Sequence, residues 1–295
     1  MGIIRRLLIL ALFWPALAQA TLDIVATSSS TGMLVREIAA EHAKLEILAP
    51  PDRDLHYLQA RPSMMRALRS ADLVVALGAE LEVGWLPVAI QQAANPKILP
   101  GQPGYFEAAA HVDRLDVGTP ADRALGDVHP MGNPHINMDP VRMAEVGKAL
   151  AERLAELDPA NAADYRRRAG AFETKVDQRL AGWQNRTGSV QGAVSFHKDV
   201  TYLLDRFGVT PLGTLEPVAG VPPTASHIKE LIDGLSGQKG VVLFTVYQPE
   251  RAPAALAEAL GWPMVRLPLE PPLGADGDGY LEHIDTWVEA LAKGR

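Results

Sequence analysis

Apolar and polar positions along the chain predict two successive sets of alternating strands and helices. In the first set, residues 33–43 and the segment after Pro62 carry apolar side chains at helical spacing. Short apolar runs of strand length lie at Leu22–Ala26, Leu45–Leu48, Leu73–Leu77 and Lys97–Leu99. Strands that alternate with helices are typical of a parallel α/β sheet, so residues 21–157 are predicted to form an N-terminal α/β lobe.

The longest regular apolar stripe lies in the middle of the chain, at residues 158–187. Asp158 and Pro159 are typical of a helix start, and apolar residues then recur every three or four positions as far as Trp183. This pattern predicts one rigid helix of roughly 40 Å at about 1.5 Å per residue. Further strands are predicted at Val190–Phe196, Val241–Val246 and Met264–Leu267. The fold class is therefore α/β, with a second lobe at residues 188–295 joined to the first by the long helix.

The first twenty residues have the pattern of a secretory signal peptide. Arg5 and Arg6 precede the apolar run Leu7–Leu17, and Ala18-Gln19-Ala20 is a small-x-small cleavage site. The sequence contains no cysteine, so neither a disulfide nor a lipid-modified cysteine is available. We therefore expect a protein of the periplasm that is secreted by a cleavable signal peptide and has no lipid anchor.

Composition indicates a globular protein and argues against a nucleic-acid partner. Hydrophobic residues make up 47% of the chain and charged residues 21%, with a formal net charge of −7. No run of basic residues appears in the sequence, and a basic patch is what nucleic-acid binding requires.

A proline-rich stretch at residues 127–140 holds two of the eight histidines, His129 and His135. Pro130 and Pro134 restrict the backbone within it, and Pro140 opens the following helix. A rigid loop that presents imidazoles is suited to a metal site. The same stretch also fits a surface loop whose histidines are solvated.

Three histidines share one structural address, because each follows a predicted strand or ends the sheet region of its lobe. In parallel sheets, ligands bind beyond the carboxyl ends of the strands, and imidazole suits zinc and other divalent first-row metals. These candidate metal ligands are His56, His135 and His197. Without cysteine, the fourth ligand is expected to be a carboxylate, and Glu270 follows the strand Met264–Leu267. Asp276, Asp278 or water are the alternatives.

The other histidines are assigned more ordinary roles. His129 is interpreted as a residue that supports the metal ligands or shapes the turn, in preference to a ligand. His42 and His283 lie in predicted helices among charged neighbours, so we expect both on the surface. His111 and His227 have no partner that the sequence identifies.

Several motifs resemble one known family, the zinc- and manganese-binding solute-binding proteins of ABC transporters (solute-binding protein family 9). Asp54-Leu55-His56-Tyr57 is similar to the first-ligand segment of that family, and Ser195-Phe196-His197-Lys198-Asp199 to the third. The most specific match is Asn133-Pro134-His135-Ile136-Asn137-Met138-Asp139-Pro140, which resembles the second-ligand motif.

The resemblance covers essentially the whole mature chain. It implies a monomer that binds one metal between two lobes and delivers it to a membrane permease with its ATPase. The chain departs from the family in two places. The spacing from Glu270 to Tyr280 is shorter than in many relatives, and the His/Asp-rich loop of many zinc-specific members is absent.

The sequence therefore predicts metal capture and not catalysis, with zinc favoured and manganese as the alternative. A secreted zinc hydrolase is a second hypothesis, but the chain has no His-Glu-x-x-His helix and no Gly-x-Ser-x-Gly motif. A third hypothesis is a binding protein for an organic solute or a metal chelate, whose ligand the histidines would contact.

Overall fold

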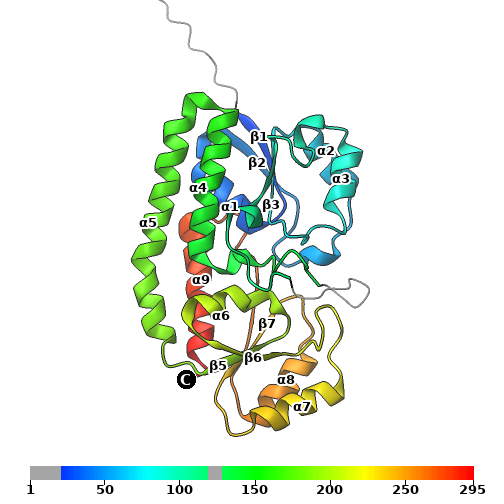
Figure 1. The fold of residues 1–295 in the computed structure, drawn as a ribbon, viewed down its shortest axis with the longest axis vertical. Coiled ribbons are helices and arrows are strands. Elements are labelled where there is room, and N and C mark those ends of the chain that lie inside the picture. The colour runs from blue at the N-terminus through cyan, green and yellow to red at the C-terminus, as the bar shows by residue number, and fades with distance from the viewer. Residues whose placement is uncertain (1–20, 119–127) are drawn as a thin grey trace, which may run out of the picture.

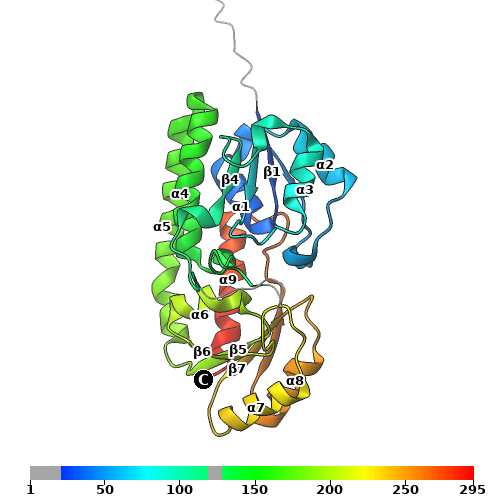
Figure 2. The same cartoon turned by 45° about the vertical axis from the view of Figure 1, so that its right-hand side comes forward.

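The computed structural model describes residues 21–118 and 128–295. The predicted signal peptide at 1–20 and the first residue of the proline-rich stretch, Asp127, lie outside the described residues. Two α/β lobes are stacked along the long axis of the molecule, and long helices run beside both of them (Figure 1). Figure 2 shows the same arrangement after a turn of 45°. The predicted fold class is confirmed.

The first lobe contains a four-stranded parallel sheet with the order β2-β1-β3-β4. Its central strand β3 (Leu73–Ala76, Leu-Val-Val-Ala) is buried at every position, as expected for a parallel strand covered on both faces. The other strands are β1 (Leu22–Ala26), β2 (Ala43–Ile47) and β4 (Tyr105–Glu107). The helices are α1 (Ser29–Ile38), α2 (Pro62–Ser70) and α3 (Leu86–Ala93).

The second lobe repeats this topology with the order β6-β5-β7-β8, again parallel throughout. Its strands are β5 (Gly192–Ser195), β6 (Thr210–Thr214), β7 (Val241–Thr245) and β8 (Met264–Leu267). Its helices are α6 (Thr201–Phe207), α7 (Ala225–Leu235) and α8 (Arg251–Leu260). In each sheet the strand order reverses beside the first strand, and such a reversal is where open parallel sheets bind ligands.

Two strands differ from the sequence expectation, and both are edge strands. Lys97–Leu99 is not a strand, because Pro96 opens a 3₁₀ turn at Pro96–Ile98 that the Asn95 side chain caps. The fourth strand lies further along, at Tyr105–Glu107. Strand β6 was not predicted, since Pro211 and Gly213 interrupt its pattern. Proline and glycine are tolerated in this way at the edge of a sheet.

Three long helices bind the lobes together. Helix α4 (Pro140–Leu157) packs along α5 (Ala162–Thr187), and α9 (Gly277–Ala292) packs on α5 and α1. One continuous apolar core includes side chains of β1 and β3 in the first lobe and of β7 in the second. A second, smaller core lies beneath α7 and α8. No helix in the described ranges is long and apolar enough to cross a membrane.

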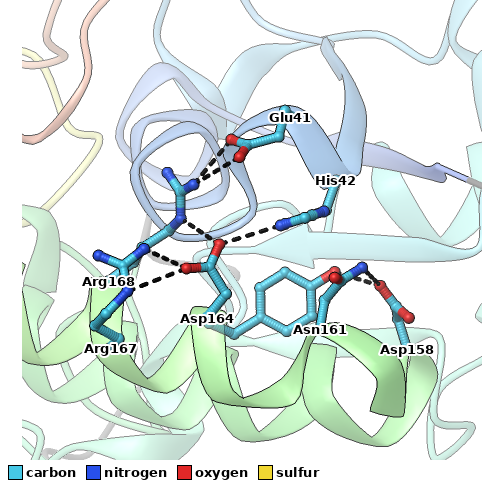
Figure 3. Close-up of polar contacts among 8 residues, drawn as sticks. Glu41, His42, Asp158, Asn161, Asp164, Arg167 and Arg168 are labelled. Carbon is cyan, nitrogen blue, oxygen red and sulfur yellow. Dashed lines mark hydrogen bonds and ion pairs between the residues drawn. The ribbon is translucent and has the colours of Figure 1, made fainter. Parts of the chain in front are cut away.

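An ion-pair network fixes the 3₁₀ turn that follows α1, Ala40–His42, to α5 (Figure 3). Asp164 Oδ2 accepts from His42 Nε2 at 3.1 Å and from Arg168 Nε at 2.8 Å, and Arg168 also binds both oxygens of Glu41 at 2.9 Å. Glu41, His42 and Asp164 are close enough to hold a cation. The guanidinium of Arg168 already lies between the two carboxylates, so the cluster is a structural clamp.

A second clamp joins the lobes at Asp139, whose side chain is completely buried. Asp139 Oδ1 accepts from the backbone N of Val141 at 2.9 Å and thereby caps α4. Arg206 of α6 donates to both carboxylate oxygens, with Nε at 2.9 Å and the terminal nitrogen at 2.8 Å. One carboxylate therefore starts a helix of the first lobe and anchors a helix of the second.

Replacing Asp139 is expected to destabilise the whole molecule. In Asp139→Ala the guanidinium of Arg206 loses its partner and α4 loses its cap, which together cost on the order of 3 kcal/mol. Urea unfolding of the metal-free protein measures this loss. Asp177→Ala, on the exposed face of α5, is the control and should change stability by less than about 0.5 kcal/mol. Equal stability of the two variants would contradict the interpretation.

Candidate metal centre

His56 lies in a short 3₁₀ turn, Leu55–Tyr57, beyond the carboxyl end of β2. Asp54 caps this turn and accepts from the backbone N of His56 at 3.0 Å and from its Nδ1 at 2.7 Å. A carboxylate can only accept, so Nδ1 carries the proton and Nε2 offers its lone pair. Burial raises the pKa of Asp54, but the hydrogen bonds that its carboxylate accepts from His56 outweigh burial, so the pKa lies below its usual range.

His135 is held in a buried loop that is bonded to the second lobe. Asn133 Oδ1 accepts from the backbone N of His135 at 3.0 Å, and Asn133 Nδ2 donates to the carbonyl of Lys198 at 2.9 Å. Tyr202 donates its hydroxyl to the Asn133 carbonyl at 2.6 Å. Both ring nitrogens of His135 are buried without a hydrogen-bond partner in the described part of the chain.

The missing partners of His135 are chemically informative. Burial of a polar group without a hydrogen bond costs about 1–3 kcal/mol, so such groups in folded proteins usually have a function. Burial, reinforced by three neighbouring histidines, lowers the pKa of His135 well below its ordinary value. The imidazole is therefore neutral, which is the form that binds a metal.

His197 follows directly after β5 and is oriented by Glu216, which lies just beyond β6. His197 Nδ1 donates to Glu216 Oε2 at 2.7 Å, and Glu216 also accepts from the backbone N of Gly220 at 3.0 Å. Burial lowers the pKa of His197, but the Glu216 hydrogen bond and the charge of Asp199 outweigh it, so the net pKa is raised. As in His56, the neutral ring then has an unprotonated Nε2.

The three imidazoles converge between the lobes. One ring nitrogen from each of His56, His135 and His197 lies within 4.8 Å of the other two. The ring centroids are 5.2 Å apart for His56 and His135, 5.4 Å for His56 and His197, and 5.5 Å for His135 and His197. Three nitrogen donors thus converge, and two of the imidazoles are hydrogen-bonded to carboxylates. Such a site is suited to zinc, copper, nickel or iron.

Glu270 lies beside this triad, at the interior side. It follows β8, is 3% exposed, and accepts from the backbone N of Ser30 at 2.7 Å, the Ser30 hydroxyl at 3.2 Å and Asn137 Nδ2 at 3.0 Å. Burial raises the pKa of Glu270 to about 7, although the Ser30 bonds oppose the rise. Glu270 lines a cavity of about 10 Å³ together with His56 and His135.

The alternatives to Glu270 lie elsewhere. Asp276 caps α9 by accepting from the backbone N of Gly279 at 3.0 Å, and Asp278 pairs with Lys175 of α5 at 3.1 Å. Among the described residues, the group at this site whose ligand atoms all lie within 4.8 Å of one another consists of the three histidines alone, so Glu270 lies outside it as the two aspartates do. Glu270 differs from the aspartates in sharing a small cavity with His56 and His135.

His129 lies on the opposite side of the triad from Glu270. Its Nε2 is 3.1 Å from Nε2 of His56, and the two ring centroids are 5.2 Å apart. With His135 and His197 it lines an open cleft of about 250 Å³ that also includes Asp116 and Glu216. His129 and Glu270 therefore border different spaces beside the triad, His129 the larger cleft and Glu270 the small cavity.

Sequence reasoning missed the supporting role of Glu216 and the burial of His283. Glu216 follows β6, the strand that the pattern did not reveal. His283 was expected on the surface, which is wrong, because it is only 8% exposed and donates Nε2–H to the Leu269 carbonyl at 3.0 Å. His111 stacks on Phe106, and His227 donates to the Thr214 carbonyl.

Comparisons with solved structures define the class of the fold. A crystal structure of a ZnuA protein has a TM-score of 0.74 at 21% identity, covering 92% of this chain and 99% of that chain. A structure of FpvC from Pseudomonas aeruginosa with Mn²⁺ also has a TM-score of 0.74 at 21% identity, covering 93% of this chain and 98% of that chain. The chain thus has the two-lobe fold of these binding proteins.

Sequence comparison gives the family. Residues 24–294 match the family described as the periplasmic component A of the zinc-uptake complex, ZnuA, and the chain belongs to that family. The high-affinity zinc uptake protein ZnuA of Yersinia pestis is 26% identical over 288 residues, covering 93% of this chain and 89% of that protein. The manganese transporter lipoprotein PsaA of Streptococcus pneumoniae is 21% identical, covering 92% of this chain and 90% of that protein. The family comprises uptake components and not enzymes, so the hydrolase hypothesis is excluded.

We expect His283 to make stability depend on pH. Burial lowers its pKa from 6.5 to about 4, so the folded state binds fewer protons than the unfolded state between these values. The contribution of neutral His283 is complete above pH ~6.5 and is lost as pH falls towards 4, by up to about 3 kcal/mol.

The comparison with His283→Gln isolates this contribution, because the variant keeps a donor for Leu269 but does not titrate. Urea unfolding of both proteins at pH 7 and pH 4.5 should show a smaller loss of stability in the variant. Equal losses would mean that His283 is not the titrating group.

Proposed function

We propose that this protein captures one divalent transition metal ion between its lobes and delivers it to an ABC transporter permease with its ATPase in the inner membrane. The observation that carries this proposal is the approach of three buried imidazole nitrogens to within 4.8 Å of one another. A metal ion would supply His135 with the partner that its ring nitrogens lack.

We propose His56, His135, His197 and Glu270 as the ligands. Zinc needs four donors at about 2.0–2.2 Å in a tetrahedron, so the histidines would draw together around it. Asp54 and Glu216 fix the proton of His56 and His197 on Nδ1, which leaves Nε2 for the metal. A complete shell of protein ligands leaves no position for a reactive water, which favours capture over catalysis.

Zinc is favoured over manganese by the donor set. Three imidazoles and one carboxylate match the preference of zinc for nitrogen, whereas manganese prefers oxygen ligands. Relatives are named for both zinc and manganese, so the family alone does not select the ion. The carboxylates of Asp54 and Glu216, hydrogen-bonded to His56 and His197, place negative charge beside the site and favour any cation over a neutral solute.

The remaining parts of the proposal concern location and assembly. The chain has no cysteine for a lipid anchor, so we propose that the protein is free in the periplasm. We also propose that it acts as a monomer, as the family resemblance implies. Its lobes span residues 21–157 and 188–295, and the long helix at 158–187 connects them.

Loss of any one histidine of the triad should weaken zinc binding by at least about 100-fold, as expected when a zinc site loses one of its protein ligands. Competition with a zinc chelator measures the affinity of His56→Ala, His135→Ala and His197→Ala. His111→Ala, which removes an exposed imidazole remote from the cleft, is the control and should bind like the parent protein.

The same titrations distinguish the remaining alternative. A binding protein for a metal chelate or organic solute would bind free zinc poorly and respond only when a chelator is present. Wild-type affinity in all three histidine variants would also reject direct ligation.

Metal binding should produce little change in overall shape. The apolar core is continuous between the lobes, and Asp139 and Glu270 bond across the boundary. Small-angle X-ray scattering with and without zinc should therefore give radii of gyration that agree within error. A clear compaction on addition of zinc would show that the lobes close as separate bodies.

A further inference from the structure

The contact between His56 and His129 places a second imidazole on the nitrogen that the metal requires. Nδ1 of His56 is bound to Asp54, so the metal must use Nε2. His129 Nε2 lies 3.1 Å from that same atom. With neutral imidazoles, His129 donates its proton and His56 accepts it. Metal binding to His56 therefore has to break this hydrogen bond.

The spacing of the two nitrogens also fits exchange of a metal between them. Two ligands of one tetrahedral zinc are about 3.3 Å apart when each bond is about 2.0–2.1 Å long. The observed separation of 3.1 Å between His129 and His56 is close to this value. A zinc ion could thus contact both nitrogens at once, with one bond forming as the other breaks.

Position in the cleft gives the two histidines different access. His129 lines the open cleft of about 250 Å³ with His135 and His197, whereas His56 lines the cavity of about 10 Å³ on the interior side, which also contains Glu270. An ion that arrives through the open cleft meets His129 before His56. The reverse order applies when the ion leaves.

We propose that His129 is a transient ligand that passes the metal between the open cleft and the buried site. This inference rests on the proposed function, and it assigns His129 to the exchange and Glu270 to the bound state. On arrival, zinc bonds to His129 and then to Nε2 of His56, and the bond to His129 breaks as the ion settles among His56, His135 and His197. Zinc tolerates five ligands during such an exchange, so the bonds to His129 and His56 can exist together while one replaces the other.

A transient ligand lowers the barrier for movement in both directions without contributing to the bound state. In His129→Phe, which keeps an aromatic ring but has no nitrogen, we expect zinc association and dissociation each to slow by about tenfold. That change corresponds to about 1.4 kcal/mol in the barrier. The dissociation constant should not become weaker. His129→Asn should behave in the same way, since an amide is a poor ligand for zinc.

Stopped-flow transfer of Zn²⁺ to and from an excess of fluorescent chelator measures both rates, with His111→Phe as a matched control. Unfolding midpoints of the metal-free variants establish that they are folded. Unchanged rates in His129→Phe would overturn the proposal, as would normal rates in His129→Asn alone. Faster association would show that His129 only competes with the metal, and affinity weaker by about 100-fold would make it a permanent ligand.

These outcomes are separate from a failure of the proposed function. If the wild-type protein binds zinc through the triad and His129→Phe exchanges it normally, only the role of His129 is rejected. If His135→Ala binds zinc like the wild type, the triad itself is rejected and the rates of the His129 variants no longer bear on it.

Discussion

Burial of imidazoles side by side is the constraint on which the rest of this structure depends. An uncharged imidazole can be buried at moderate cost, but several protonated ones cannot be held together in a medium of low dielectric constant. The fold answers this in two ways. His56 and His197 each receive a carboxylate partner, and His135 is buried deeply enough to stay neutral. The result is a set of lone pairs directed into one small volume.

Placing those lone pairs requires both lobes, because no single sheet supplies all three histidines. His56 comes from the first sheet and His197 from the second. His135 lies in the first lobe by its position in the sequence, but the loop that holds it contacts both lobes. Asn133 bonds to the second lobe, and Asp139 joins α4 to Arg206. Glu270 crosses in the opposite direction and accepts from Ser30 at the start of α1. A carboxylate at this position is also favoured by the helix dipole.

The apolar pattern of the parallel strands predicted both the fold and the convergence of the histidines. Parallel strands have strong apolar patterns, and their carboxyl ends share one edge of the sheet, so His56 and His197 could be placed without coordinates. Edge strands such as β6 are only partly covered and include Pro211 and Gly213, so their pattern is weak. Because β6 was not predicted, the sequence also did not reveal that Glu216 follows it and supports His197. His283 was misjudged because its neighbours in the sequence are charged, whereas in the fold it is only 8% exposed and donates to the Leu269 carbonyl.

Burial of the proposed ligands favours tight binding of a metal ion, but it also makes release of the ion harder. A buried shell of protein ligands holds an ion tightly, and a carrier has to give it up again to another protein. Wide opening of the lobes would provide a route, but the shared core and the bonds of Asp139 and Glu270 oppose it. An exchange between neighbouring side chains needs only local movement. His129 lines the cleft of about 250 Å³ beside the triad, whereas Glu270 lines a cavity of only about 10 Å³, so the cleft is where such an exchange has room to occur.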